Sequence, residues 1–116
     1  MKIFDIDQYR GMEDPIPGIV LSEEDKAVKL GGVLIVLAPG AEGVYHYHER
    51  TEAVYVIVSG APSVINEGVE TKVKPGDVIF MPAGEKHVAV NRTDKPASFF
   101  EFFTDPPVGS DYVPVE

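Results

Sequence analysis

The chain has 116 residues, no cysteine and a formal net charge of -9, from 10 Lys and Arg against 19 Asp and Glu. Without cysteine there are no disulfides and no thiolate metal sites, so any metal ion must be held by nitrogen and oxygen atoms. The negative charge repels phosphate backbones and anionic lipids, which disfavours nucleic acids and membranes as partners.

The N-terminal stretch MKIFDIDQYRGMEDPIP carries acidic residues throughout and has no apolar run of signal-peptide length. Nowhere does the sequence reach the roughly 18 consecutive apolar residues of a membrane span. These features predict a cytoplasmic protein. The length and the 44% hydrophobic content fit one globular domain over residues 1–116.

Short runs rich in Val, Ile, Phe and Tyr follow one another along most of the chain, separated by glycine and proline. The predicted strands occupy residues 33–38, 44–48, 53–59, 62–65, 69–73, 77–81, 87–91 and 97–103. Short strands at this spacing predict an all-β sandwich or barrel. The one helix-like window, SEEDKAVKL from Ser22, is too short to predict a helix, and the proline-rich tail from Asp105 is predicted to lack regular structure.

Two turns between these strands have specific chemistry. Pro75 and Gly76 suit the second and third positions of a type II turn, because proline presets φ and glycine tolerates a positive φ. The segment Ile65-Asn66-Glu67-Gly68-Val69 predicts a hairpin with Gly68 in the left-handed conformation.

Three histidines and one glutamate form the candidate site. Side chains at i and i+2 of a strand share a face, so His46 and His48 project together, and Glu52 opens the next strand close by. His87, the only other histidine, begins a separate strand. A single histidine in a strand is most often an ordinary polar residue, but three imidazoles with a carboxylate suit Mn, Fe, Co, Ni, Cu or Zn.

These residues also carry a resemblance to a known family. The spacing of Gly40, His46, His48 and Glu52 resembles the first motif of the cupins. The second cupin motif is matched in full by Gly76, Pro82, Gly84, His87 and Asn91. One departure is that Ser59 stands where the first motif usually closes with glycine, and Gly60 follows; a longer strand or a bulge would absorb the extra residue.

The resemblance implies a double-stranded β-helix, also called a jelly roll or cupin barrel. The motif-bearing barrel would span about residues 33–103, with an N-terminal segment 1–32 and a C-terminal tail 104–116 attached. It implies one divalent transition-metal ion (Mn, Fe, Ni or Zn) held by His46, His48, Glu52 and His87. The family contains isomerases, epimerases, dioxygenases, decarboxylases, lyases and non-enzymatic binders, so we expect a metal-dependent enzyme acting on a small polar or sugar-like molecule, with a non-catalytic small-ligand binding or sensing protein as the alternative.

Several other residues near the predicted ligands have two interpretations. Arg50, Lys86 and Glu101 are either solvated charges or groups that meet a substrate, and a carboxylate among the phenylalanines around Glu101 would have a raised pKa. Asn91 is either a pocket group or a polar residue that ends a strand. Tyr55 is expected, with Tyr45 and Tyr47, to point away from the barrel interior.

The strand ASFFEFF has phenylalanines in both phases, so both of its faces seek burial. A barrel has one interior, and the second face therefore predicts a homodimer. The alternative is that loops or the N-terminal segment cover this face.

Overall fold

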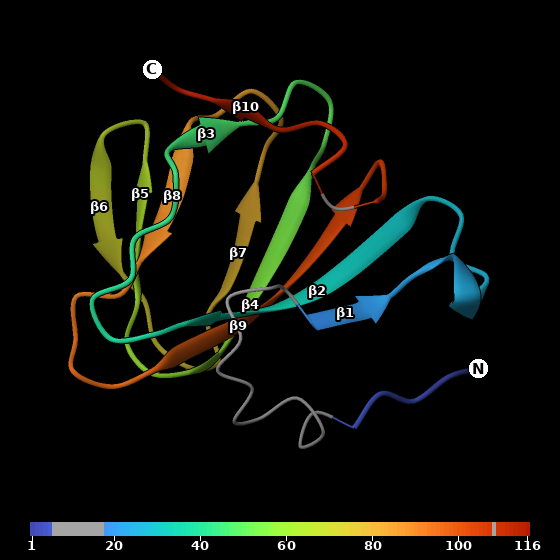
Figure 1. Ribbon diagram of the computed structural model, residues 1–116, viewed down its shortest axis with the longest axis horizontal. Coiled ribbons are helices and arrows are strands. Elements are labelled where there is room, and N and C mark those ends of the chain that lie inside the picture. The colour runs from blue at the N-terminus through green and yellow to red at the C-terminus, as the bar shows by residue number, and fades with distance from the viewer. Residues whose placement is uncertain (6–17, 108) are drawn as a thin grey trace.

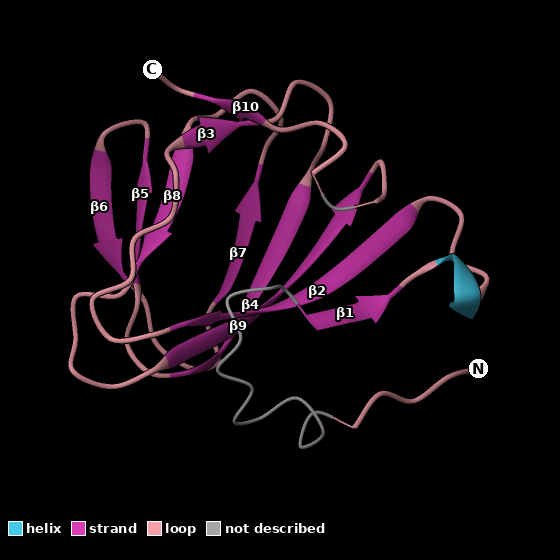
Figure 2. Cartoon of the chain, in the orientation of Figure 1, coloured by secondary structure: helices cyan, strands magenta, loops and turns pink. Residues whose placement is uncertain are grey.

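The computed structural model describes residues 1–5, 18–107 and 109–116. Two five-stranded antiparallel sheets face each other in it (Figures 1 and 2). The first sheet has the order β1 (Gly18–Leu21), β2 (Leu30–Leu37), β9 (Ala97–Thr104), β4 (Ala53–Ser59) and β7 (Val78–Met81). The second has the order β10 (Val113–Pro114), β3 (His46–Tyr47), β8 (His87–Val90), β5 (Ser63–Asn66) and β6 (Val69–Lys72).

This arrangement confirms the all-β jelly roll expected from the sequence. Each of the eight predicted strand regions contains a strand, and the helix-like window reduces to one 3₁₀ turn, η2 (Glu23–Asp25). None of the helical segments in the described residues is long and apolar enough to cross a membrane.

The prediction that the tail from Asp105 lacks regular structure was wrong for Val113 and Pro114, which form a strand. β10 pairs with β3, with Val113 opposite Tyr47 and Pro114 opposite His46. The proline content of the tail suggested irregular structure, but Pro114 lies on an edge strand, where a missing N–H costs no ladder hydrogen bond. The C-terminal segment therefore closes the second sheet beside β3.

The core lies between the two sheets and follows the two-residue period of the strands. On β9, the side chains of Ala97, Phe99 and Phe103 are buried, whereas Phe100 and Phe102 occupy the other phase and stack on each other with ring centroids 5.9 Å apart. The buried residues of the core are Val33, Ala53, Tyr55, Ile57, Val64, Val73, Met81, Phe99 and Phe103. The expectation that Tyr55 points outward was wrong, because it shares the inward phase of β4 with two core residues.

Both predicted turns and the predicted irregularity are present. Gly76 has φ +93°, and the Asp77 amide donates to the Lys74 carbonyl over 3.0 Å, as in a type II turn. Gly68, with φ +81°, lies in the two-residue turn between β5 and β6. At the position where Ser59 departs from the cupin motif, the pairing of β4 with β9 shifts register between Ile57 and Ser59.

We expect Gly60→Ala to destabilise the fold more than Gly76→Ala does. Both glycines have positive φ, +76° and +93°, and alanine there costs on the order of 1–2 kcal/mol. At Gly60 the new Cβ would also lie 2.5 Å from the Pro96 carbonyl oxygen, whereas at Gly76 nothing lies within 4 Å. Urea denaturation should show that Gly60→Ala lowers the free energy of unfolding by roughly 3 kcal/mol or more. Equal losses in the two variants would contradict the clash.

Candidate metal centre

The three histidines converge at one end of the space between the sheets. His46 on β3 is directly opposite His87 on β8 in the antiparallel pair, and His48 follows His46 at the same-face spacing. Their ring centroids lie 4.4 to 5.5 Å apart. One potential ligand atom from each ring lies within 4.8 Å of the others.

Backbone carbonyls orient all three rings. The Nδ1 atom of His46 lies 2.6 Å from the Val44 carbonyl oxygen, and that of His87 lies 2.9 Å from the Glu85 carbonyl oxygen. The Nδ1 atom of His48 bonds the Asp111 carbonyl. Because a carbonyl oxygen only accepts, each Nδ1 carries the proton, and each neutral ring offers its Nε2 lone pair.

The surroundings of His87 provide the strongest indication that the cluster binds a ligand or a metal ion. Its side chain is 3% exposed, and its Nε2 is buried without a hydrogen-bond partner among the described residues. A buried polar atom without a partner is costly, and in native proteins it calls for a specific explanation. Burial lowers the pKa of His87 to about 4 and also lowers the pKa of His46, so both rings favour the neutral form that binds a metal ion.

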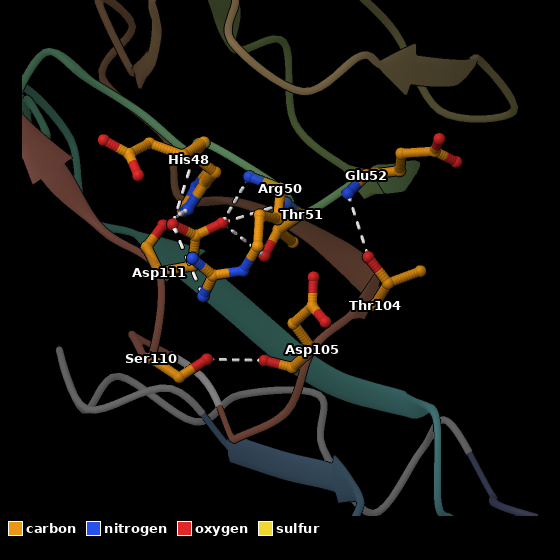
Figure 3. Close-up of polar contacts among 9 residues, drawn as sticks. His48, Arg50, Thr51, Glu52, Thr104, Asp105, Ser110 and Asp111 are labelled. Atoms are coloured by element: carbon orange, nitrogen blue, oxygen red, sulfur yellow. Dashed lines mark hydrogen bonds and ion pairs between the residues drawn. The ribbon is translucent and has the colours of Figure 1, made fainter.

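The Glu52 carboxylate does not join this cluster. The inward residues at the start of β4 are Ala53 and Tyr55, and Glu52 falls in the opposite phase, where its side chain is exposed. Its backbone amide donates to Thr104 Oγ1 over 3.0 Å, and Figure 3 shows its side chain pointing away from His48. The structure therefore brings together three of the four ligands predicted from the sequence.

Asp111 holds the loop between His48 and β4. Its carboxylate accepts hydrogen bonds from the amides of Glu49, Arg50 and Thr51 over 3.2, 2.7 and 2.9 Å, and from Thr51 Oγ1 over 3.1 Å (Figure 3). These bonds, the one from Arg50 first, lower the pKa of Asp111 to about 2. The same residue accepts from His48 through its carbonyl, so one tail residue fixes both the loop and a candidate ligand.

Tyr112, the next residue in the tail, borders the cluster. Its ring centroid lies 4.6 Å from that of His46, and its side chain is 41% exposed, so it forms part of the rim of the site. No local motif in the sequence marked Asp111 or Tyr112, because their role depends on the return of the tail to β3. Of the other charged candidates, Arg50 is exposed with a guanidinium nitrogen 4.0 Å from Asp111, and Lys86 is exposed.

Asn91 is a structural residue rather than a pocket group. It is 1% exposed, and its Nδ2 donates to the carbonyls of Leu37, Ala38 and Lys95 over 3.0, 3.3 and 2.7 Å. Its Oδ1 accepts from the amide and hydroxyl of Thr93. The second cupin motif thus ends in a side chain that ties two loops together.

Glu101 is an interior carboxylate that lines the same cavity as His48. It lies in the inward phase of β9 and lines a cavity of about 20 Å³ together with His48, Thr51 and Phe103. Burial raises the pKa of Glu101 to about 7. A larger cavity, of about 390 Å³, has a mostly apolar wall that includes Val28 and is not lined by the histidines.

These features fit a transition-metal ion. Three neutral imidazoles form a borderline nitrogen donor set, each ring is oriented by a hydrogen bond at its other nitrogen, and one of the donor atoms is buried without another partner. The described residues contribute no fourth protein ligand to the cluster. Such a set leaves coordination positions for water or for a ligand, as catalytic sites require.

Comparisons with known proteins agree with this fold. A family model described as a cupin domain matches residues 33–103. No curated protein matches the chain. Among solved structures, an uncharacterized conserved protein with a double-stranded beta-helix domain from Klebsiella pneumoniae subsp. pneumoniae MGH 78578 is 24% identical, with a TM-score of 0.80 over 100% of this chain and 98% of that chain.

Two further solved structures carry functional descriptions. A sugar phosphate isomerase from a cupin superfamily, from Silicibacter pomeroyi DSS-3, is 31% identical with a TM-score of 0.67, and the match covers 77% of this chain and 59% of that chain. A predicted oxalate decarboxylase from Thermotoga maritima is 27% identical with a TM-score of 0.71, covering 76% and 77% of the two chains.

We expect Asp111→Asn to lower the melting temperature at pH 7 by about 5–10 °C, because the amide replaces one acceptor oxygen with a donor that faces backbone N–H groups. Asp94→Asn, at an exposed position, is the matched control and should change little. The wild-type advantage over Asp111→Asn should also shrink as the pH falls from about 4 towards 2. The native pKa of about 2 lies below the ordinary 3.8, so this contribution is complete above the unfolded-state value and is lost on titration through the native one. A difference between the variants that stays constant over this pH range would contradict the clamp.

Proposed function

Because the chain belongs to the cupin domain family, we propose that it binds one divalent transition-metal ion through His46, His48 and His87 and acts with it on a small polar molecule. The observation that carries this proposal is the shared orientation of the rings. Three separate carbonyls hold the Nδ1 atoms, and the Nε2 of His87 is buried with no other partner. A hydrogen-bonded structural role would instead give that nitrogen a donor.

The ion would supply a Lewis acid that polarises a carbonyl or hydroxyl group of the bound molecule. The residues of the chain contribute the rest of the site. His87 is enclosed by the barrel, whereas His46 and His48 are partly exposed, so a ligand reaches the cluster from their side. Tyr112 offers an aromatic edge beside His46 at this opening.

The proposed ligands are small oxygen-rich molecules. Two structurally similar proteins are described as a sugar phosphate isomerase and a predicted oxalate decarboxylase, and both names refer to molecules dense in oxygen donors. Catalysis is favoured over simple binding or sensing by a carboxyl group, Glu101, whose pKa of about 7 lies near working pH and which lines a cavity with His48.

Protein purified from cells grown with Mn, Fe, Ni and Zn together should contain about one metal ion per chain by elemental analysis. His87→Ala and His48→Ala should lose most of it, and metal removal should lower the wild-type melting temperature because only the folded state binds the ion. Glu52→Gln is the matched control and should keep the metal, since its side chain is exposed outside the cluster.

Two results would refute the site. One is wild-type protein that holds no metal even after reconstitution. The other is full metal content in both histidine variants. Loss of the ion from Glu52→Gln alone would return that carboxylate to the ligand set.

The proposed assembly is a homodimer formed through the outer face of the first sheet. The outer phase of β4 and β9 places Val54 beside Phe102 and Val56 beside Phe100 in the register. The adjoining edge strand β7 adds Val78 and Phe80, which are 67% and 58% exposed. A continuous apolar surface of this kind is typical of an interface.

We expect the wild-type protein to sediment as a dimer at micromolar concentration and Val78→Glu to shift it to monomer, because a charge on this face would be buried unpaired. Val69→Glu is a matched control: Val69 is 66% exposed, also on an edge strand, but in the second sheet. A monomeric wild type would overturn the proposed dimer, and so would equal dissociation in the two variants.

A further inference from the structure

Glu101 occupies the centre of the inner face of the first sheet. In the register it lies between Val33 on β2 and Tyr55 on β4, which are 1% and 5% exposed. Its neighbours in the same phase of β9 are the buried Phe99 and Phe103. A carboxyl group in this position is costly to fold, which favours a role beyond packing.

The environments of Glu101 and Asp111 differ in a way that assigns them different roles. The Asp111 carboxylate accepts three backbone amides and one hydroxyl, which keep it ionised and leave little capacity to accept a proton. The Glu101 carboxyl instead accepts a hydrogen bond from the Tyr55 hydroxyl. Burial raises the pKa of Glu101 to about 7, and the Tyr55 hydroxyl lowers it in part. Two carboxyl groups tuned apart in this way are typical of sites that transfer protons.

Glu101 and Tyr55 both adjoin the histidine cluster without belonging to it. Glu101 shares the wall of the cavity of about 20 Å³ with His48, and the Tyr55 ring centroid lies 6.2 Å from that of His87. The Glu101 carboxyl is not among the atoms grouped within 4.8 Å at the cluster. It therefore lies beside the cluster, on the cavity wall that it shares with His48, without being placed as a metal ligand.

We propose that Glu101, positioned by the Tyr55 hydroxyl, exchanges a proton with a small hydroxylated or chelating ligand bound at His46, His48 and His87. In this step the O–H bond of the ligand breaks, its proton moves to a carboxylate oxygen of Glu101, and the electron pair stays on the ligand oxygen. The reverse transfer restores the starting state, so no other reactant is needed. This inference rests on the proposed metal site and deepens it by naming the acid–base residue.

The test uses zinc-loaded protein and acetohydroxamic acid, a small chelator that gives up a proton when it binds a metal ion. Calorimetry at pH 8 in buffers of different ionisation enthalpy counts the protons released to solution. Wild type should release almost none, because Glu101 is ionised at this pH in the free protein and takes the proton of the ligand. The protonated carboxyl then donates a hydrogen bond to the negatively charged ligand oxygen, which raises the pKa of Glu101 above its free-protein value of about 7. Glu101→Gln should release about one proton per ligand and bind at least tenfold more weakly. Glu52→Gln, an exposed carboxylate on the other face, should behave as wild type.

Two more variants keep the test decisive if Glu101→Gln does not fold. Glu101→Asp should retain the proton, since a carboxylate remains. Tyr55→Phe should shift the pH profile of proton release upward, because the lost hydrogen bond raises the pKa of Glu101. The titratable groups around Glu101 are Tyr55 and, along the cavity wall, His48, Asp105 and Asp111.

The outcomes separate this inference from the metal site itself. Equal proton release from wild type and Glu101→Gln, with zinc content intact, would overturn the role of Glu101 and leave the metal site standing. Zinc-loaded wild type that does not bind the chelator would also overturn it. Absence of zinc from reconstituted wild type would remove the proposed function and this inference together.

Discussion

The pairing of β3 with β8 is the constraint on which the candidate site depends. It places His46 directly opposite His87, although β3 is only two residues long. Because side chains alternate between the faces of a sheet, a slip of one residue would turn one histidine away from the other. On the side of β3 that faces away from β8, β10 pairs with β3. Asp111 anchors the loop that follows β3. The tail thus holds the register that brings the histidines together.

The carboxyl groups of Asp111, Glu52 and Glu101 differ in what they can do because their surroundings differ. Asp111 is surrounded by amide donors and serves as an anchor. Glu52 is exposed on the outer side of β4, where water screens its charge. Glu101 lies among aromatic side chains with a tyrosine hydroxyl as partner, which leaves it close to the balance between its two protonation states. The role that each carboxyl group can take therefore depends on its surroundings more than on whether it belongs to Asp or Glu.

The first sheet also has two apolar faces, and they serve different ends. Its inner face supplies most of the core and carries Glu101 towards the histidines, whereas its outer face presents valine and phenylalanine at the surface. The phenylalanines of β9 contribute to both faces, which is why this strand has no polar phase. Function and proposed assembly therefore meet on the two sides of one strand.

The sequence by itself determined the fold class, the eight central strand regions, the turns at Gly68 and Gly76 and the grouping of the three histidines. Local periodicity, turn chemistry and motif spacing act over a few residues, so they can be followed along the chain. Only the tertiary structure decided the phase of β4, which sends Glu52 outward and Tyr55 inward, and the return of the tail to β3. The turn after His48 sets that phase through bonds to Asp111, a residue distant in sequence. Such long-range contacts leave no local pattern. The sequence offered two interpretations of Glu101, and only the structure placed it in the inward phase of β9 beside Tyr55.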